Sequence, residues 1–387
     1  MQYLDEKISV APMMDITDRH WRYMLRGFSK RTVLYSEMVV DDTVNHNLQN
    51  LDYLIGRDIE EGPSVIQLGG YNPETLAEAA WACENVLKGG YSEINLNCGC
   101  PSDRVKKRCF GASLMLEPDL VREIVNQMQR RVSIPITVKC RLGVDNKDSY
   151  DELTTFIRSC VDGGSKKFIL HSRKAILKGL STKQNRDIPP LKYEVVHRLV
   201  KDFPDLTFVI NGGILNFEQG CEHMESEYMY TPVEDPLGKD ASVSLPPVHG
   251  VMIGRAAFNN PCIFAEADSR FYGCGDPLIS RRQAVERYLE YCERALSATG
   301  PRKRSLDGQK EKEKAFSTPV LLKPLHNMMV GLQHNQKYRR ALNDLYDEKV
   351  RECKGQGHID PREIVEGAML CLSDWELDQP LGLRARK

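Results

Sequence analysis

Short apolar runs rich in β-branched residues recur along the first 255 residues, and most are followed by a longer segment with apolar residues at helical spacing. This alternation is typical of βα units that build a parallel sheet. The predicted strands are the runs 8–13, 33–39, 64–70, 93–99, 136–143, 167–173, 207–213 and 250–255. Eight such strands favour an α/β fold of the (β/α)8 TIM-barrel type over an open doubly wound sheet, because the chain has no G-x-G-x-x-G fingerprint.

Several segments between these runs carry helix signals. Asn72 can cap a helix that Pro73 opens at its first position. In 119–131 and 151–162, apolar residues recur at a spacing that places them on one helical face. We therefore expect these segments to form outer helices that cover the barrel.

Two stretches depart from the βα pattern. The segment 227–247, rich in proline, glycine and acidic residues, predicts a surface insertion before the last strand. After about residue 275 the strand signals end, and the segments 281–298, 317–332 and 337–353 predict helices. The expected organisation is a barrel domain over 1–274 followed by an all-helical C-terminal domain over 275–387, with a charged loop at 301–315.

Composition narrows the class of protein only in part. A formal net charge of −1 argues against a globally basic nucleic-acid binder. The segment 301–345 nevertheless holds ten Lys/Arg against four Asp/Glu, so a solvated helical face and a local polyanion site both stay open. Twelve scattered cysteines without zinc spacing predict neither disulfides nor a metal site, and fit a reducing, cytoplasmic compartment. No apolar run is long enough to span a membrane, so we expect a soluble protein.

Unusual polar residues stand at the ends of the predicted strands. They are Gln67, Asn95, Asn97, Cys100, Lys139, Arg141, His171, Arg173, Asn211 and Arg255. Because active sites of TIM barrels lie at the carboxyl ends of the strands, these residues predict one converging ring.

One side of this ring has the features of a phosphate site. Glycines follow the seventh and eighth strands, where backbone N–H groups can bind a phosphate and Arg255 can add a charged fork, unless Gly212 and Gly213 merely turn the chain. Lys139 lies in an apolar strand and needs a partner, which an anionic cofactor would supply. His171 could be a packing residue, but its place beside Arg173 favours the site.

Three cysteines surround the turn after the fourth strand. A thiol at a strand mouth can reach a substrate and donate a proton. Cys98 and Cys100 are two residues apart, so a strand-like backbone would point both the same way, and spacing alone does not separate them. Cys109 lies beyond the turn and is expected to pack as a small buried hydrophobe.

Ordered motifs over residues 8–270 resemble the tRNA-dihydrouridine synthase family, and within it the DusA-type branch. They are APMMDITDRHWRYMLR, LYSEMV, QLGG, INLNCGCPSDRV, FGASLM, VKCRLGVDNKDSY, HSRKAILKGLS, NRDIPPL, INGGI and GVMIGRAAFNNP. The resemblance implies an FMN-dependent oxidoreductase that uses NADPH to reduce D-loop uridines of tRNA, in this branch positions 20 and 20a, to 5,6-dihydrouridine. It also implies that the helical domain binds tRNA.

The resemblance assigns roles residue by residue. The backbone of Pro12, Met13 and Met14 would lie along the flavin, Gln67 would bond its pyrimidine edge, Lys139 its N1/O2 side, and His171 would lie near the ribityl chain. The phosphate would be held by Asn211, Gly212, Gly213, Gly254 and Arg255. The tRNA-contacting positions would be Asn97, Arg173, Lys183 and Arg186, with Lys337, Arg339 and Arg340 in the helical domain. The motif N-x-x-C-P selects Cys100 as the acid that protonates C5 while the hydride adds at C6.

Two other functions compete with this one. A small-molecule dihydropyrimidine oxidoreductase built on an FMN barrel would explain the ring of polar residues but not the basic helical appendage. A non-catalytic tRNA-binding module would explain the appendage, but it has no need for Cys100, Lys139 and His171. The insertion at 227–247 and the loop at 301–315 depart from the compact family pattern. A monomer is expected, with no membrane partner.

Overall fold

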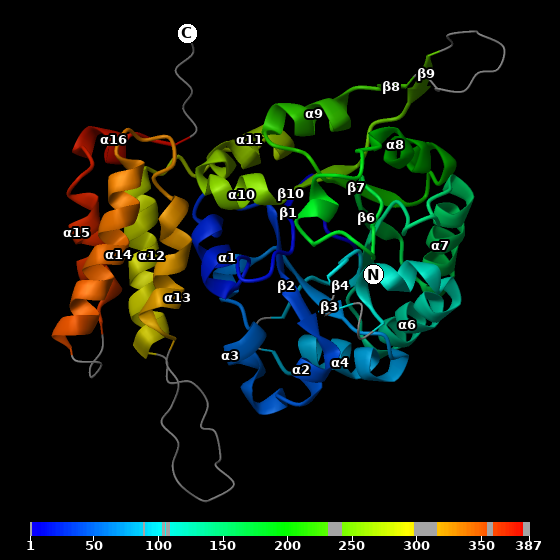
Figure 1. The fold of residues 1–387 in the computed structure, drawn as a ribbon, viewed down its shortest axis with the longest axis horizontal. Helices are drawn as coiled ribbons and strands as arrows, with labels where there is room; N and C mark the ends of the chain where they lie inside the picture. Colours follow the sequence, from blue (N-terminus) through cyan, green and yellow to red (C-terminus); the bar gives the residue numbers. More distant parts are fainter. Residues whose placement is uncertain are drawn as a thin grey trace, which may run out of the picture. The chain divides into compact units, whose positions relative to one another are not determined.

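Eight parallel strands close into a barrel in the order β1-β10-β7-β6-β5-β4-β3-β2 (Figure 1). The strands are β1 (Ile8–Val10), β2 (Val33–Val40), β3 (Ser64–Gly69), β4 (Glu93–Cys98), β5 (Ile136–Arg141), β6 (Lys167–His171), β7 (Thr207–Asn211) and β10 (Gly250–Ile253). Each falls on one of the eight predicted runs, so the TIM-barrel prediction is confirmed. This computed structural model describes residues 2–87, 90–102, 105, 109–230, 242–297, 316–353 and 359–381.

By compactness the chain divides into two units, of which the first comprises residues 1–14, 32–48 and 62–254 and contains the barrel. Its helices are α2 (Asp41–Asn45), α4 (Pro73–Asn85), η3 (Gly111–Leu116), α6 (Pro118–Arg131), α7 (Tyr150–Gly163), η4 (Gln184–Arg186), α8 (Tyr193–Asp202) and α9 (Phe217–Glu225). As expected, the Asn72 side chain caps α4 by accepting from the backbone N–H groups of Glu74 and Thr75. The predicted apolar face of α7 is buried as well.

The second unit comprises residues 15–31, 49–61 and 255–387, and its described elements are helical. They are α1 (Arg19–Arg26), α3 (Leu51–Ile55), η2 (Ile59–Glu61), α10 (Arg255–Asn259), η5 (Pro261–Glu266), α11 (Ala267–Tyr272), α12 (Arg281–Ser297), α13 (Thr318–Leu322), η6 (Lys323–Asn327), α14 (Asn335–Glu352), α15 (Pro361–Met369) and α16 (Asp374–Asp378). A short turn, η1 (Leu48–Asn50), spans the point where the two units meet in sequence. In the part of the chain that the structure describes, no helix combines the length and apolarity that a bilayer span needs.

Two sequence predictions outside the barrel need correction. The segment 317–332 is not one helix but α13 followed by the tighter turn η6, because Pro324 has no N–H to continue an α-helical hydrogen-bond ladder. The ends of the 227–247 insertion form an unexpected antiparallel ribbon of β8 (Tyr228–Tyr230) and β9 (Val243–Leu245). The charged loop predicted at 301–315 lies outside the described residues, as do positions 231–241.

The β8–β9 ribbon is tied to α8. The imidazole of His197 stacks on the ring of Tyr228 with 4.5 Å between centroids. Its Nδ1 lies 2.7 Å from the carbonyl oxygen of Pro246, just after the ribbon. The two ends of the insertion are therefore held side by side on the outside of the barrel.

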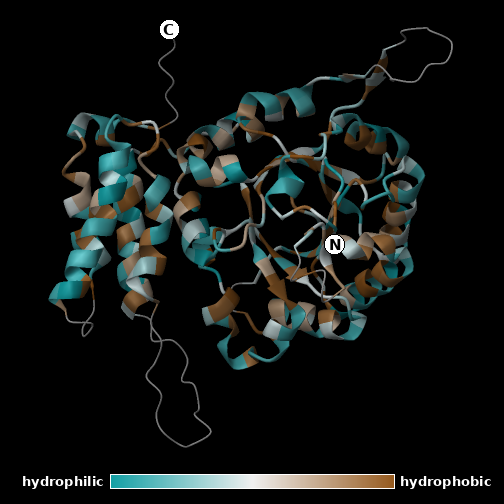
Figure 2. Cartoon of the chain, in the orientation of Figure 1, coloured by the Kyte–Doolittle hydropathy of each residue, from teal (hydrophilic) through white to brown (hydrophobic). Residues whose placement is uncertain are grey.

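Inside the barrel, the middle layer is apolar. Tyr35, Val65, Ile169, Val209 and Met252 belong to one buried cluster, and each is fully protected from solvent. Figure 2 shows the corresponding strands largely in the hydrophobic colour, while the exposed helix α14 is largely hydrophilic. Side chains from different strands thus fill the interior, as in other TIM barrels.

Beneath this layer, at the amino-terminal ends of the strands, lies a charged floor that sequence reasoning missed. Nζ of Lys167 on β6 lies 2.6 Å from a carboxylate oxygen of Glu6 and 3.0 Å from one of Glu93 on β4. The hydroxyl of Tyr35 donates to Glu6 over 2.9 Å, and the backbone N–H of Leu4 donates to Glu93. All three charged side chains are fully buried. Burial raises the pKa of Glu93 to about 7, although Lys167 opposes the shift.

Candidate active site

A chain of buried amides links β3, β4 and β5, from Asn97 near the carboxyl end of β4 to Thr137 near the amino-terminal end of β5. Nδ2 of Asn97 donates to Oε1 of Gln67 over 2.7 Å, and Nε2 of Gln67 donates to Oδ1 of Asn95 over the same distance. Nδ2 of Asn95 then donates to the hydroxyl of Thr137 over 2.9 Å. The backbone N–H of Gln67 donates to Ser36 Oγ, at an irregularity where β2 shifts its register against β3. Each of these amides is therefore held by hydrogen bonds within the barrel.

The same chain controls the turn that carries Cys100. Oδ1 of Asn97 accepts from the backbone N–H groups of Gly99 and Cys100 at 3.1 and 2.9 Å. Nε of Arg141 donates to the Gly99 carbonyl oxygen over 3.0 Å. Gly111 packs so closely that a Cβ there would lie 2.6 Å from the Cys100 carbonyl oxygen. Cys100 itself is partly exposed, so its thiol can meet a substrate while its backbone is held on three sides.

The other two cysteines have different environments. Cys98 is fully buried, and burial raises the pKa of its thiol well above the ordinary value, with Cys140 adding to the effect. The strand ends at Cys98, and the backbone N–H of Cys100 donates to Asn97 in the turn that follows, so the strand-like backbone on which the comparison of Cys98 and Cys100 depended does not extend to Cys100. The prediction that Cys109 is buried is also wrong, because it is exposed, with a positive φ of 58°.

Lys139 and Asn211 form a pair across the barrel interior. Nζ of Lys139 donates to Oδ1 of Asn211 over 2.8 Å, and β6 lies between the strands that carry them. Nδ2 of Asn211 donates to the Met252 carbonyl oxygen. Burial and, to a lesser degree, repulsion by Arg141 together lower the pKa of Lys139 to about 8. The predicted buried cation, Lys139, therefore has a neutral partner in Asn211 and can still pair with an anionic ligand.

His171 lies where four cationic side chains exert their fields. Burial, together with the charges of Arg141, Lys139, Arg173 and Arg186, lowers its pKa well below the ordinary value, which favours the neutral ring. Its Nδ1 is buried and has no hydrogen-bond partner among the described residues. An unpaired buried ring nitrogen among cations is an arrangement that an anionic, hydrogen-bonding ligand would satisfy.

The glycines after β7 are held in conformations that favour glycine. Gly212 and Gly213 have φ values of 104° and 74°. The hydroxyl of Tyr193 donates to the Gly212 carbonyl oxygen over 2.7 Å, and a Cβ at Gly213 would meet that same hydroxyl. A Cβ at Gly212 would lie 3.1 Å from the His171 ring. These contacts fix the turn next to His171 and leave no room for other residues.

The segment after β6 is built around one buried amide. Asn185 bonds the backbone N–H and carbonyl of Ile176, and Arg141 donates to the Asn185 carbonyl oxygen over 2.8 Å. Among the predicted tRNA contacts, Lys183 is exposed, while Arg186 and Arg173 are half-buried. The guanidinium of Arg173 donates to the Pro189 carbonyl oxygen.

The remaining predicted residues are placed as follows. Pro12 and Met13 are half-buried after β1, Met14 is exposed, and Gly254 packs against Ala11 and Met13. Arg255 is exposed at the start of α10 and belongs to the second unit. Lys337, Arg339 and Arg340 are exposed on α14, while the neighbouring Tyr338 is buried.

Sequence reasoning assigned no role to Thr137, Tyr193 or Asn185, and it placed Arg141 in the ring without a function. Thr137 and Arg141 share the alternating face of β5 with Lys139, and that periodicity is the one signal that could have revealed them. Tyr193 and Asn185 lie outside the strands, where no period marks them.

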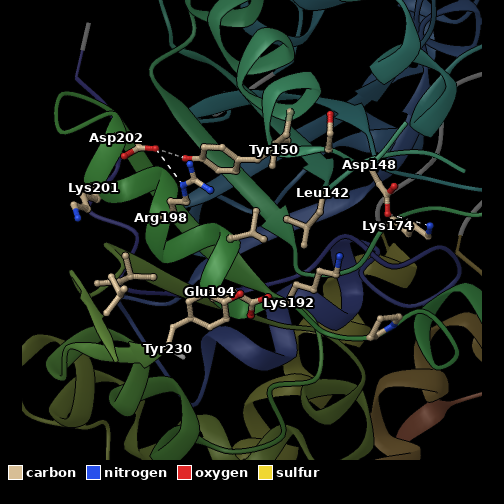
Figure 3. A pocket seen from close by; sticks show the side chains of 16 residues that line it. Leu142, Asp148, Tyr150, Lys174, Lys192, Glu194, Arg198, Lys201, Asp202 and Tyr230 are labelled. Carbon is tan, nitrogen blue, oxygen red and sulfur yellow. Dashed lines mark hydrogen bonds and ion pairs between the residues drawn. The ribbon is translucent and has the colours of Figure 1, made fainter. Parts of the chain in front are cut away.

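A separate cavity of about 720 Å³ lies outside the barrel, against α7, α8 and the ribbon (Figure 3). Its charged groups largely pair: Lys174 with Asp148, and Arg198 with Asp202, whose carboxylate also accepts from Tyr150. Of the described residues predicted to form the site, none lines this cavity. This cavity and the candidate chemistry are thus in different places.

Comparison with known proteins gives one consistent result. The family model described as Dihydrouridine synthase (Dus) matches residues 9–229. The chain is 45% identical over 289 residues to a tRNA-dihydrouridine(20/20a) synthase of Synechocystis sp., which covers 75% of this chain and 79% of that protein. It is 43% identical over 292 residues to a protein of the same name from Vibrio cholerae, covering 75% and 81%. The resemblance seen in the sequence motifs is confirmed.

Proposed function

Because the chain belongs to the dihydrouridine synthase family, we propose that it reduces D-loop uridines of tRNA at positions 20 and 20a to 5,6-dihydrouridine, using FMN and NADPH. The observation that carries this proposal is the partly exposed Cys100, held by Asn97 and Arg141 at the same barrel mouth as Lys139 and His171. The two relatives compared above, which are covered over 79% and 81% of their lengths, carry the name tRNA-dihydrouridine(20/20a) synthase, which supports the positions.

The residues present fit FMN. The unpaired Nδ1 of His171 lies among four cations and against the Gly212 turn, which suits a ribityl phosphate. Lys139 would bind the N1/O2 side, and Gln67 keeps one N–H and one lone pair beyond its two amide bonds for the pyrimidine edge. Met13, Gly213 and Gly254 would complete the site. When bound, reduced FMN supplies the hydride that adds to C6 of the uracil ring.

The protein itself supplies the proton and the geometry. The thiol of Cys100 donates a proton to C5, and solvent restores it after product release. Asn97 and Arg141 hold the backbone around Cys100. The turn that carries the thiol is therefore fixed before the substrate binds, and the reaction does not have to pay the entropy of ordering it. Since the target uridine is stacked in folded tRNA, it must be extracted into the barrel, and phosphate contacts from Arg173, Lys183 and Arg186 offset that cost.

The test is dihydrouridine formation, mapped by position on an unmodified tRNA transcript with FMN and NADPH. Dihydrouridine at positions 20 and 20a supports the proposal, and dihydrouridine elsewhere in the tRNA refutes the positions but not the reaction. Turnover of free uracil without tRNA would favour a small-molecule oxidoreductase. Protein that binds tRNA but remains colourless after incubation with FMN would favour a binding module. Parallel reactions with NADH compare the two reductants.

FMN binding should weaken as the pH rises through about 8. The pKa of Lys139 is lowered to about 8, so the ammonium that attracts an anion is present below that pH and lost above it. Flavin fluorescence titrations above about pH 7, where the FMN phosphate is already fully charged, measure the effect. The Lys139→Met variant should bind FMN more weakly and show no such step. A step of equal size in that variant would remove Lys139 as its cause.

The helical segment 275–387 is proposed as the tRNA-binding domain, with α14 as its contact surface. Reversing charge with Arg339→Glu and Arg340→Glu should weaken tRNA binding, and should reduce the slope of log K against log salt by about 0.7 to 0.9 for each phosphate that the protein no longer neutralises. FMN affinity should not change. Filter binding at several salt concentrations measures the slope.

The matched control for this prediction is Arg351→Glu on the same helix. Arg351 is exposed like Arg339 but lies about 18 Å further along α14. Equal weakening by both variants would indicate a general charge effect, and no weakening by either would remove α14 from the tRNA surface.

A further inference from the structure

The amide chain that begins at the barrel mouth has fixed donors at its Asn97 end and a fixed acceptor at its Thr137 end. The backbone N–H groups of Gly99 and Cys100 can only donate, so Oδ1 rather than Nδ2 of Asn97 must face them. At the far end, the hydroxyl of Thr137 lies 3.5 Å from the Ile94 carbonyl oxygen, which can only accept. Each end of the chain is therefore a backbone group that is fixed as either a hydrogen-bond donor or an acceptor.

Between these ends, each amide has one orientation. Asn97 must present Nδ2 to Gln67, which must present Nε2 to Asn95, which must present Nδ2 to Thr137. Turning any one amide over would bring two N–H groups or two oxygens face to face. All four side chains are buried, so water cannot repair such a mismatch. Aligned hydrogen bonds also polarise one another, which strengthens the chain.

We propose that Thr137 and Asn95 are positioning residues that act through Gln67 and Asn97 on the turn that carries Cys100. The inference rests on the proposed function in taking Cys100 as the proton donor. Neither positioning residue touches Cys100 in the hydrogen bonds described. They determine which atoms Gln67 and Asn97 present, and thereby whether Asn97 can accept from the Cys100 backbone.

The test compares Thr137→Val, which keeps the shape and removes the hydroxyl, with Thr137→Ser, which restores it. The control is Thr154→Val in α7, because Thr154 is also buried but bonds only its own helix, at the Asp151 carbonyl oxygen. Iodoacetamide alkylation of Cys100 is measured by peptide mass spectrometry on the full chain without substrate. The exposed thiols of Cys109 and Cys274 are references within the same molecule.

We expect Thr137→Val to raise the Cys100 alkylation rate roughly fivefold, the effect of losing one buried hydrogen bond. Thr137→Ser and Thr154→Val should keep the native rate, and both reference thiols should be unaffected. A native Cys100 rate in Thr137→Val would overturn the inference, and so would an equal rise at all three thiols. If Thr137→Val does not fold, Thr137→Ala, which also lacks the hydroxyl, replaces it.

Activity separates this inference from the proposed function. With tRNA as substrate, Thr137→Val should lower kcat by up to about a hundredfold and leave KM unchanged, since only the placement of the acid is altered. Restored kcat in Thr137→Ser supports positioning. If Cys100 alkylation responds as expected but the native chain forms no dihydrouridine, the proposed function fails and the positioning stands. A change in KM with native kcat would overturn positioning.

Discussion

Replacing Cys100 with alanine should slow dihydrouridine formation by about 10² to 10⁴-fold, because the reaction would lose the proton donor that we propose for C5. Binding of FMN and tRNA should persist, since the backbone contacts of Cys100 with Asn97 and Ala112 do not use the thiol. Single-turnover assays with saturating tRNA measure the chemical step apart from binding.

Two further variants give this result its meaning. Cys98→Ala should retain most activity, because Cys98 is buried and its thiol has a strongly raised pKa. Cys109→Ala tests an exposed thiol on the same loop and should also remain active. Loss of activity in Cys98→Ala with full activity in Cys100→Ala would transfer the role to Cys98. Equal activity in all variants would show that no cysteine donates the proton.

Replacing Lys167 with methionine should destabilise the protein by about 3–5 kcal/mol, the usual cost of leaving buried charges without their partner. Glu6 would keep the hydroxyl of Tyr35 and Glu93 the backbone N–H of Leu4, but both buried carboxylates would lose the cation that they share. Lys166→Met is the control, because Lys166 is the adjacent residue and is exposed. Urea unfolding followed by circular dichroism measures both variants. Similar midpoints for the two would exclude a stabilising role for the floor.

The deficit of Lys167→Met should depend on pH. The pKa of Glu93 is raised to about 7 from an ordinary value of 4.5, so the folded state holds a proton that the unfolded state releases between those values. Stability from this group therefore falls as the pH rises from 4.5 to 7, and without Lys167, which lowers the pKa of Glu93, the fall should continue to higher pH and become larger. The difference in unfolding free energy between the variant and the native protein should be smallest near pH 4.5 and largest above pH 7. A deficit that grows toward acid pH would contradict this expectation.

The barrel could be predicted from sequence because each strand is a short apolar run bounded by helix signals. The gathering of the candidate site residues could be predicted because parallel strands bring their carboxyl ends together. The floor could not, since Glu93 and Lys167 stand at the starts of their runs and resemble ordinary charges at the edge of a strand. Only the closed barrel brings them together with Glu6. The choice between Cys98 and Cys100 depended on where β4 ends, and boundaries are the least determined part of a strand pattern.

The paired ends of the 227–247 insertion have a practical consequence. The pairing of β8 with β9 holds Tyr230 and Val243 opposite each other. The two points at which an inserted segment would join the chain are therefore fixed, whatever the length of that segment. Doubling a flexible loop between fixed ends costs only about 0.6 kcal/mol. A fluorophore tag or affinity epitope can therefore be inserted between these two residues, which gives a handle for immobilising the enzyme on a surface with Cys100 unmodified.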